Sequence, residues 1–338
     1  MDNPIDLLIG PTVYRSGMQL HARTIKGSKG MRKFLTTSLL LVCIICSLGA
    51  QGSVESQTRE EPIISITDSR DRTIQFTEYP DHIVSLSPNI TETIFALGAQ
   101  HKLVGRTDYC DYPEETVSIP PMGDLLTPSV ERIVASGADL VIIGNLGQLQ
   151  TIEAIEQAGI PVAFLDEPET MEGTFSIIEG VGLLTGKTQE AKILTDEMRK
   201  RLQQVKSFSS DDRPTVYYAA GFGQWGDFTA TGDTFIHDII MLAGGDNIAV
   251  DAVNWSFQLE LLHAADPDII ILPALWGSTF QQTYEQFVNH PSYASLSAVQ
   301  RDAIVTVDSN MIERQGPRSV LAIEILAQQF AAIQDRWQ

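Results

Sequence analysis

The chain has few cysteines and few basic residues. Only three cysteines occur in 338 residues, and two of them, Cys43 and Cys46, lie in an apolar run near the N-terminus. Cys110 is therefore alone in the rest of the chain, which must be stable without a disulfide. Lysine and arginine number 23 against 43 aspartates and glutamates, for a net charge of -20. This balance argues against a nucleic-acid partner, because phosphate binding needs a basic surface.

Recognisable catalytic and metal-binding patterns are missing as well. The sequence has no GxSxG, HExxH or phosphate-binding loop, and Cys110 has no histidine near it in the sequence. The chain is therefore not expected to be an enzyme. Direct binding of zinc or manganese is disfavoured because the histidines are scattered. The histidines after the apolar run are His82, His101, His237, His263 and His290.

One long hydrophobic run occurs, in MRKFLTTSLLLVCIICSLGAQG, which starts at Met31. Two basic residues, the apolar run and the small residues that follow are typical of a secretory signal. We expect a signal peptide at 31–50, an upstream extension at 1–30 that is absent from the mature protein, and a tether at 51–62. The protein would then be periplasmic or otherwise extracytoplasmic. A retained anchor helix is one alternative, and a lipid on Cys46 is another, although Ile45 precedes that cysteine where a small residue is usual.

Strand-like and helix-like segments alternate along the rest of the chain. After a hairpin pattern in ISITDSRDRTIQF, apolar strands such as HIVSLS and DLVIIG alternate with helical segments. A second alternating series begins at PTVYYAA. The pattern predicts an α/β fold of two lobes, 63–170 and 208–338, each with a central, mostly parallel sheet flanked by helices.

Residues 171–207 have a different pattern. MEGTFSIIEGVGLLTG reads as one helix, and KTQEAKILTDEMRKRLQQVKS continues for about twenty residues without glycine or proline. A helix of that length is about 30 Å long. We expect this segment to be a helical connector in which one long rigid helix joins the lobes.

One helix–turn–strand unit occurs twice. VERIVASGADLVII at 130–143 and LELLHAADPDIIIL at 259–272 share a glutamate (Glu131, Glu260) and, eight residues later, an aspartate (Asp139, Asp268). Thr127 and Ser256 lie four residues before the glutamates and could cap the helices. Each glutamate would then lie near a helix start, where the dipole favours an acid. Stabilising those helix starts is the simplest role for the two glutamates.

From about Ile63 onward, the chain resembles the extracytoplasmic substrate-binding proteins of ABC importers. The branch is the one with a helical backbone, which carries cobalamin, iron–siderophore complexes or haem, and the resemblance is greatest to the cobalamin binders. It rests on IVSLSPNITETIFALGA, VGRTDYCDYP, VERIVASGADLVII, LELLHAADPDIIIL and VDSNMIERQGPRSVLAIEILA, in this order. Leu125 and Gly144–Asn145 stand where the cobalamin binders tend to have aromatics, so ferric siderophore and haem remain alternative ligands.

The resemblance implies a role for the repeated glutamates. In that family, Glu131 and Glu260 correspond to positions that dock onto the permease. A permease dimer has twofold symmetry, so an acid on each lobe could enter two equivalent arginine pockets. The expected partners are thus a permease dimer and a small-molecule ligand, with the binding protein itself a monomer.

The ligand is expected at the loops that follow the strands of each sheet, where ligands bind in open α/β folds. Three of the four tryptophans fall in these loops, and aromatic rings there could pack on a large planar ligand. No resident cofactor is expected beyond that ligand. The predicted ligand-binding residues are Tyr109, Trp225, Trp255, Trp276 and Arg314.

Overall fold

The computed structural model describes residues 61–206, 213–223, 226–275 and 277–337. Residues from Glu61 to the C-terminus form one compact unit. The predicted upstream extension, the signal peptide and nearly all of the tether lie outside the described residues. Trp225 and Trp276 also lie outside them.

The described chain begins with the predicted antiparallel hairpin. Strand β1 (Ile64–Thr67) pairs with β2 (Thr73–Phe76), with Ile64 opposite Phe76. The turn is organised by the carboxylate of Asp68, which accepts hydrogen bonds from the backbone N–H groups of Arg70 (3.0 Å) and Arg72 (3.1 Å). A side chain that binds nearby backbone donors in this way is a common device of polar turns.

The first sheet is fully parallel and has the order β4-β3-β5-β6. Its strands are largely buried, as expected when helices cover both faces. The strands are β3 (Ile83–Ser85), β4 (Leu103–Arg106), β5 (Leu140–Ile143) and β6 (Val162–Phe164). The helices between them are α1 (Pro88–Ala96), η2 (Gln100–Lys102), η3 (Glu114–Ser118), α2 (Val130–Ala135) and α3 (Leu149–Gln157).

The second sheet repeats this topology. Its order, β10-β9-β7-β8, is again parallel, and in both sheets the first strand in sequence lies between the second and the third. The strands are β7 (Thr215–Tyr218), β8 (Asp246–Asn247), β9 (Ile269–Ile271) and β10 (Ile304–Val305). The helices are α6 (Phe235–Leu242), α7 (Leu259–Ala265), α8 (Phe280–Val288), α9 (Ser297–Gln300) and α10 (Ser309–Ile312).

The two repeated aspartates accept equivalent hydrogen bonds in the two sheets. Asp139, just before β5, accepts hydrogen bonds from the backbone N–H of Asp81 and His82, just before β3. Asp268, just before β9, accepts from the backbone N–H and the hydroxyl of Thr215, the first residue of β7. Each aspartate therefore joins the starts of the first and third strands of its sheet, which explains its place in the repeated unit.

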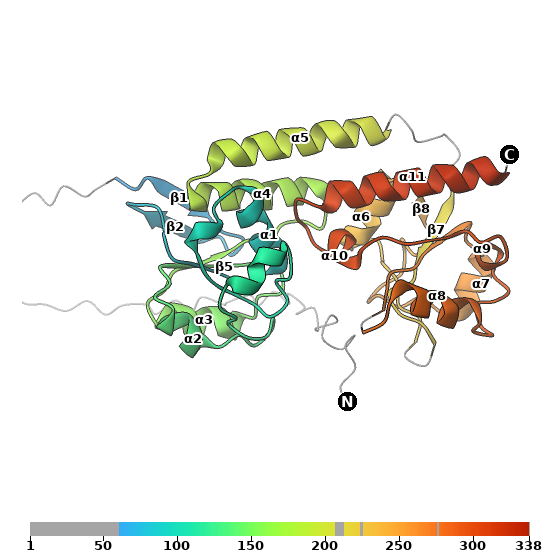
Figure 1. The fold of residues 1–338 in the computed structure, drawn as a ribbon, viewed down its shortest axis with the longest axis horizontal. Coiled ribbons are helices and arrows are strands. Elements are labelled where there is room, and N and C mark those ends of the chain that lie inside the picture. The colour runs from blue at the N-terminus through green and yellow to red at the C-terminus, as the bar shows by residue number, and fades with distance from the viewer. Residues whose placement is uncertain (1–60, 207–212, 224–225, 276, 338) are drawn as a thin grey trace, which may run out of the picture. The chain divides into compact units, whose positions relative to one another are not determined.

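The connector is a helical hairpin rather than a single rod. Helices α4 (Met171–Thr185) and α5 (Thr188–Lys206) meet at Gly186, which ends α4 in the left-handed conformation (φ 74°). Close contact of the two helices needs Gly182, since a Cβ there would lie 2.4 Å from the Cβ of Ala191. Helix α11 (Ser319–Trp337) packs on α5, and Figure 1 shows α4, α5 and α11 along one side of the described chain.

One continuous core links both sheets to these helices. On β5, Leu140 and Ile142 belong to the core that also contains β7, β9 and α11, whereas Val141 and Ile143 face a second core under α2 and α3. This alternation is the normal consequence of the two-residue period of a strand. The two-lobed α/β fold, with parallel sheets flanked by helices, is therefore as predicted.

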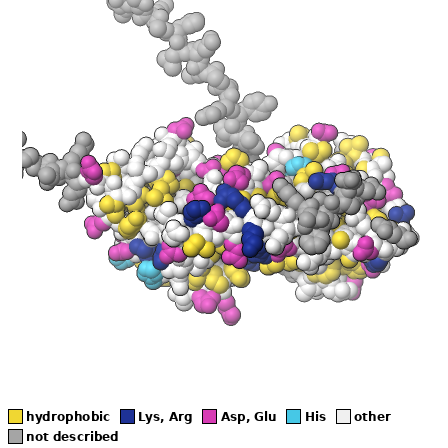
Figure 2. Space-filling view, turned by 90° about the horizontal axis from the view of Figure 1, so that it is seen from above, with side chains coloured by type: hydrophobic (Ala, Val, Ile, Leu, Met, Phe, Trp, Pro, Cys, Tyr) yellow, Lys and Arg dark blue, Asp and Glu magenta, His cyan; other side chains and the backbone are white. Residues whose placement is uncertain are grey.

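Acidic side chains predominate on the surface. Figure 2 shows aspartate and glutamate spread over the visible face, with lysine and arginine in small groups among them. Within the described part of the chain, none of the helices has both the length and the apolar character needed to span a bilayer.

Candidate functional site

Glu131 and Glu260 occupy the same position in equivalent helices. Each is the second residue of the helix that precedes the third strand of its sheet, and each is exposed. Figure 1 shows α2 and α7 on the side of the described chain away from α5. The proposed caps were wrong, because the N-cap residues are Ser129, which accepts from the backbone N–H of Arg132, and Gln258, which makes no side-chain cap.

Two loops at the carboxyl ends of the first sheet, those after β3 and β5, are hydrogen-bonded to each other. They lie at the point where the strand order reverses. The hydroxyl of Ser87, after β3, accepts a hydrogen bond from the backbone N–H of Gly144, after β5, at 2.7 Å. Gly144 suits this close approach, since a Cβ there would lie 3.0 Å from the Ser87 hydroxyl. This reversal point is where open α/β sheets usually bind ligands.

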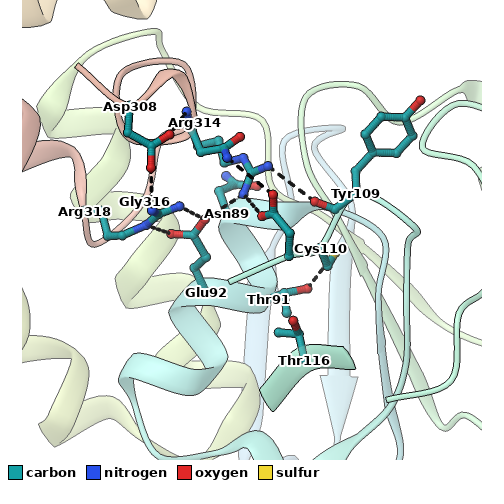
Figure 3. Close-up of polar contacts among 12 residues, drawn as sticks. Asn89, Thr91, Glu92, Tyr109, Cys110, Thr116, Asp308, Arg314, Gly316 and Arg318 are labelled. Atoms are coloured by element: carbon teal, nitrogen blue, oxygen red, sulfur yellow. Dashed lines mark hydrogen bonds and ion pairs between the residues drawn. The ribbon is translucent and has the colours of Figure 1, made fainter. Parts of the chain in front are cut away.

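An ion-pair cluster connects this edge to the segment between α10 and α11. Glu92 on α1 has a side chain only 3% exposed and binds two arginines. Its carboxylate accepts from Arg314 Nη1 at 3.0 Å and from Arg318 Nε and Nη2, each at 2.8 Å. Figure 3 shows both guanidinium groups approaching Glu92. We call Glu92, Arg314 and Arg318, with the partners Asp111 and Asp308, the interlobe clasp.

Asp111 and Asp308 are the remaining carboxylate partners of the two arginines. Asp111 accepts from Arg314 Nη1 at 2.7 Å, and Asp308 lies 3.5 Å from Arg318 Nη1. The guanidinium of Arg318 also stacks over the ring of Tyr112, 4.0 Å from its centroid. Both arginines, 15% and 12% exposed, are thus engaged by the protein itself.

Backbone contacts reinforce the clasp. The Asn89 side chain donates to the carbonyl of Gln315 at 3.1 Å, and the Gln315 side chain donates to the carbonyl of Pro168 at 2.7 Å. Where α4 begins, its first backbone N–H, on Met171, donates to the carboxylate of Asp238 on α6 at 2.7 Å. The lobes are therefore joined by directed polar contacts as well as by the shared core.

Trp255 is held in an uncommon backbone conformation. Asn254 and Trp255 both have φ of 57°, and Val253 and Ser256 on either side form an antiparallel bridge. Two left-handed residues in succession are the pattern of a tight two-residue hairpin turn, in which glycine is the favoured second residue. A tryptophan there is rare, and strained residues of this kind often lie at functional sites. Its ring is half-buried against the core.

Tyr109 lies beside the clasp, and its carbonyl accepts from Arg314 Nη2 at 3.4 Å. In Figure 3 its ring points away from the two arginines. Burial and the neighbouring Asp124 raise the pKa of the Tyr109 phenol above its ordinary value. The structure thus brings Tyr109 and Arg314 together, while Trp255 belongs to a separate hairpin.

A second polar anchor holds the loop after β7. Tyr293 donates its hydroxyl proton to Asp227 at 2.6 Å and accepts from the backbone N–H of Gly223 at 2.8 Å. The ring of Tyr293 stacks on Phe287, with centroids 4.6 Å apart. These contacts support the described residues on both sides of the predicted Trp225, which itself lies outside the described chain.

Glu92, Asp111 and Asp308 were not among the site residues predicted from the sequence. One signal was present, since Glu92 is the only charged residue of its helix and is flanked by the buried Thr91 and Thr93. Its partner Arg314 is 222 residues away, however, and local patterns cannot pair residues at that separation. Across the described residues, no group of three His, Cys, Asp or Glu side chains could hold a metal ion.

Comparison with known proteins adds to this geometry. The family model described as periplasmic binding protein matches residues 83–311, which is more than half of the chain. The chain belongs to the periplasmic binding protein family. The match includes both parallel sheets and the helical hairpin between them.

Curated relatives of this periplasmic binding protein cover most of its length. A cobalamin-binding protein of Halobacterium salinarum is 28% identical over 78% of this chain and 73% of that protein. An uncharacterized ABC transporter substrate-binding lipoprotein of Bacillus subtilis is 26% identical over 78% of this chain and 84% of that protein.

Solved structures show the same fold. A periplasmic haem-binding protein from Roseiflexus sp. RS-1 superposes with a TM-score of 0.68 at 26% identity, over 75% of this chain and 98% of that chain. The periplasmic vitamin B12 binding protein of Vibrio cholerae gives 0.63 at 22% identity, over 75% and 98%. The second likeness concerns the fold alone.

Proposed function

We propose that this chain binds cobalamin or a related corrinoid between its two lobes and delivers it to the permease of an ABC importer. The family match and the Bacillus relative support the broader role, a solute-binding protein that works with such a permease. Binding and release suffice for that role, so no bond in the ligand needs to be broken.

The observation that carries the docking proposal is the equivalence of Glu131 and Glu260. Both are exposed second residues of equivalent helices in two sheets of identical strand order. Stabilising a helix start would account for either acid alone. Two acids in matched places also suit a twofold-symmetric permease, where each could form a charge-assisted pair with an arginine.

The choice of a corrinoid rests on the name of one relative. The Halobacterium relative, 28% identical over 78% of this chain, is named for cobalamin. In this proposal Tyr109, Trp225, Trp255 and Trp276 contact the ligand, and Arg314 borders it.

Haem and ferric siderophore are the alternative ligands. The Roseiflexus haem-binding protein, at 26% identity, favours haem as the second candidate. Calorimetry of the mature protein with cyanocobalamin, haemin and ferric siderophores would separate the candidates. We expect saturable one-to-one binding of cyanocobalamin. Tight binding of haemin with a new Soret band, and none of cyanocobalamin, would replace the corrinoid with haem.

Docking is tested by the double substitution Glu131→Ala and Glu260→Ala in vesicles that contain the permease and its ATPase subunits. Transport should be abolished while ligand affinity stays within about twofold, because the acids lie outside the ligand loops. The control is Glu153→Ala with Glu285→Ala, two exposed glutamates, one on α3 and one on α8. Transport lost equally in the control, or unaffected by the first pair, would contradict the docking role.

The N-terminal expectations belong to the same proposal. A signal peptide at 31–50 should leave a mature chain that starts close to residue 51, in an extracytoplasmic compartment and as a monomer. Intact-mass measurement of the exported protein, with light scattering, tests both points. A mass that includes residues 1–30, or an added lipid on Cys46, would revise this part alone.

A further inference from the structure

Asp124 begins the loop that leads into α2, the helix that carries Glu131. Its side chain is half-buried, and the carboxylate oxygen Oδ1 accepts hydrogen bonds from the backbone N–H groups of Leu126 (2.8 Å) and Thr127 (3.4 Å). An aspartate that binds backbone donors two and three residues ahead fixes a tight turn. Asp124 therefore sets the shape of the chain just before α2.

Backbone hydrogen bonds join this loop to the end of β4 and to the start of α2. The carbonyl of Arg106, in β4, accepts from the N–H of Met122 at 2.7 Å. The N–H of Asp108, just after β4, donates to the carbonyl of Gly123 at 2.9 Å. Towards α2, the N–H of the N-cap residue Ser129 donates to the Met122 carbonyl at 2.7 Å. The loop is thus held between the strand-end loop after β4, where a ligand is expected, and α2.

The side chain of Asp124 also reaches that strand-end loop. Tyr109 lies in it, and the Tyr109 ring points away from the two arginines of the clasp (Figure 3). Burial raises the pKa of the Tyr109 phenol, and Asp124 raises it further, by its charge and by accepting a hydrogen bond. One carboxylate therefore contacts a predicted ligand residue and the turn before α2.

The second lobe makes an equivalent connection through its backbone. Trp255, another predicted ligand residue, lies three residues before Gln258, the N-cap of α7. The Trp255 carbonyl accepts from the N–H of Thr229 at 2.9 Å. In the first lobe a side chain makes the connection, so a substitution can remove it and leave the backbone intact.

We propose that Asp124 is a positioning residue shared by the ligand site and the docking surface of the first lobe, holding the Tyr109 phenol and the turn into α2 with one carboxylate. The inference rests on the proposed function, which supplies the two sites, and goes beyond it by connecting them. A change at the phenol is then transmitted to Glu131 on a different element. Coupling between two binding sites is reciprocal, so docking also acts on the ligand loop.

Hydrogen exchange on the mature protein tests the shared contact without a ligand or a permease. Tyr109→Phe removes the phenol's hydrogen bond and leaves the turn, Asp124→Ala removes both contacts, and Asp124→Asn keeps an oxygen for the turn. Backbone amides in residues 124–135 should exchange about twofold to tenfold faster in Tyr109→Phe, and faster still in Asp124→Ala. Asp124→Asn should match Tyr109→Phe. Exchange in residues 253–265 should not change.

The matched control is Asp302→Asn. Tyr284 on α8 donates its phenol proton to Asp302 at 3.0 Å, so this variant breaks the same kind of pair in the second lobe. Exchange in residues 124–135 should stay at the wild-type rate. The proposal is overturned if Tyr109→Phe and Asp124→Ala leave that rate unchanged, or if the control raises it equally.

Docking is measured with ligand-free protein on the permease and its ATPase subunits in nanodiscs. Tyr109→Phe and Asp124→Asn should each weaken docking by about twofold to tenfold. Because both remove the same hydrogen bond, the double variant should dock no more weakly than the weaker single variant. A tyrosine that only contacted the ligand would leave docking of the ligand-free protein unchanged. Asp302→Asn should dock like the wild type.

The results separate this inference from the proposed function. Unchanged docking in both variants, or effects that multiply in the double variant, would overturn the shared role and leave the docking function standing. If the wild-type protein does not dock, the docking function fails. Faster exchange in Tyr109→Phe would then still support Asp124 as the residue that positions both elements, and an unchanged rate would overturn it.

Discussion

At the scale of single residues, Trp255 combines an unfavourable backbone with a half-buried ring. A left-handed conformation costs a residue with a Cβ about 1–2 kcal/mol, whereas glycine adopts it freely. The turn nevertheless carries Asn254 and Trp255 in succession. Retention of a bulky ring where glycine would be more stable is consistent with a role in ligand contact.

Comparing Trp255→Ala with Trp255→Gly separates the loss of the ring from the relief of the left-handed backbone. Both variants remove the ring, so both should weaken ligand binding equally, by about 1–3 kcal/mol if the ring stacks on the ligand. Only the glycine variant relieves the backbone, so its free energy of unfolding should exceed that of the alanine variant by about 1 kcal/mol. Urea denaturation and calorimetry measure the two quantities. Equal stability of the two variants would argue against a left-handed turn in solution.

At the scale of elements, each sheet is fastened at its start by one aspartate. Asp139 and Asp268 accept hydrogen bonds at the beginnings of the first and third strands, so they satisfy backbone donors that have no strand partner there. The repeated unit therefore contains one acid that fastens the sheet and one exposed glutamate, for which we propose docking.

The aspartates should differ in their contribution to stability. Asp268 is half-buried and binds both the N–H and the hydroxyl of Thr215, whereas Asp139 is exposed. We expect Asp268→Ala to lower the free energy of unfolding by about 1–3 kcal/mol and Asp139→Ala by less. Asp268→Asn keeps one acceptor oxygen and should fall between wild type and Asp268→Ala. Urea denaturation of the three variants checks the order, and a larger loss at Asp139 would contradict it.

At the scale of the whole molecule, the lobes are joined in two ways. A continuous core passes from the first sheet through the helices to the second sheet, and the interlobe clasp adds directed ion pairs next to the strand-end loops. We expect a junction of this kind to favour small adjustments between the lobes over wide opening. The clasp also engages Arg314, the arginine that was predicted from the sequence to contact the ligand.

Glu92→Gln tests the clasp. Loss of one charge leaves two largely buried arginines short of a partner, so the free energy of unfolding should fall by about 3–5 kcal/mol. The matched control is Glu324→Gln, which weakens a single, more exposed pair with Arg201 and should cost about 1 kcal/mol or less. Thermal and urea unfolding supply both values, together with the rate of limited proteolysis. Similar small losses in the two variants would show that the clasp does not hold the lobes together.

The sequence alone predicted the alternation of strands and helices, the two parallel sheets, the hairpin, the helical pair and the repeated unit. These depend on hydrophobic periodicity and on turn residues, which act over a few neighbouring positions. The same local patterns placed both glutamates near helix starts but predicted the wrong N-cap residues. Ser129 was an equally good candidate in the first helix, and the second helix begins after Gln258 without a side-chain cap.

Only the tertiary structure determined which charged side chains form ion pairs and hydrogen bonds with one another. Nothing in the sequence pairs Glu92 with Arg314, 222 residues away, or shows that Asp139 and Asp268 bind the starts of other strands. Such partners depend on how the sheets and helices pack, and a side chain has many candidate partners until packing leaves one within reach. For the same reason, the left-handed turn at Trp255 and the engagement of Arg314 became visible only in the folded chain.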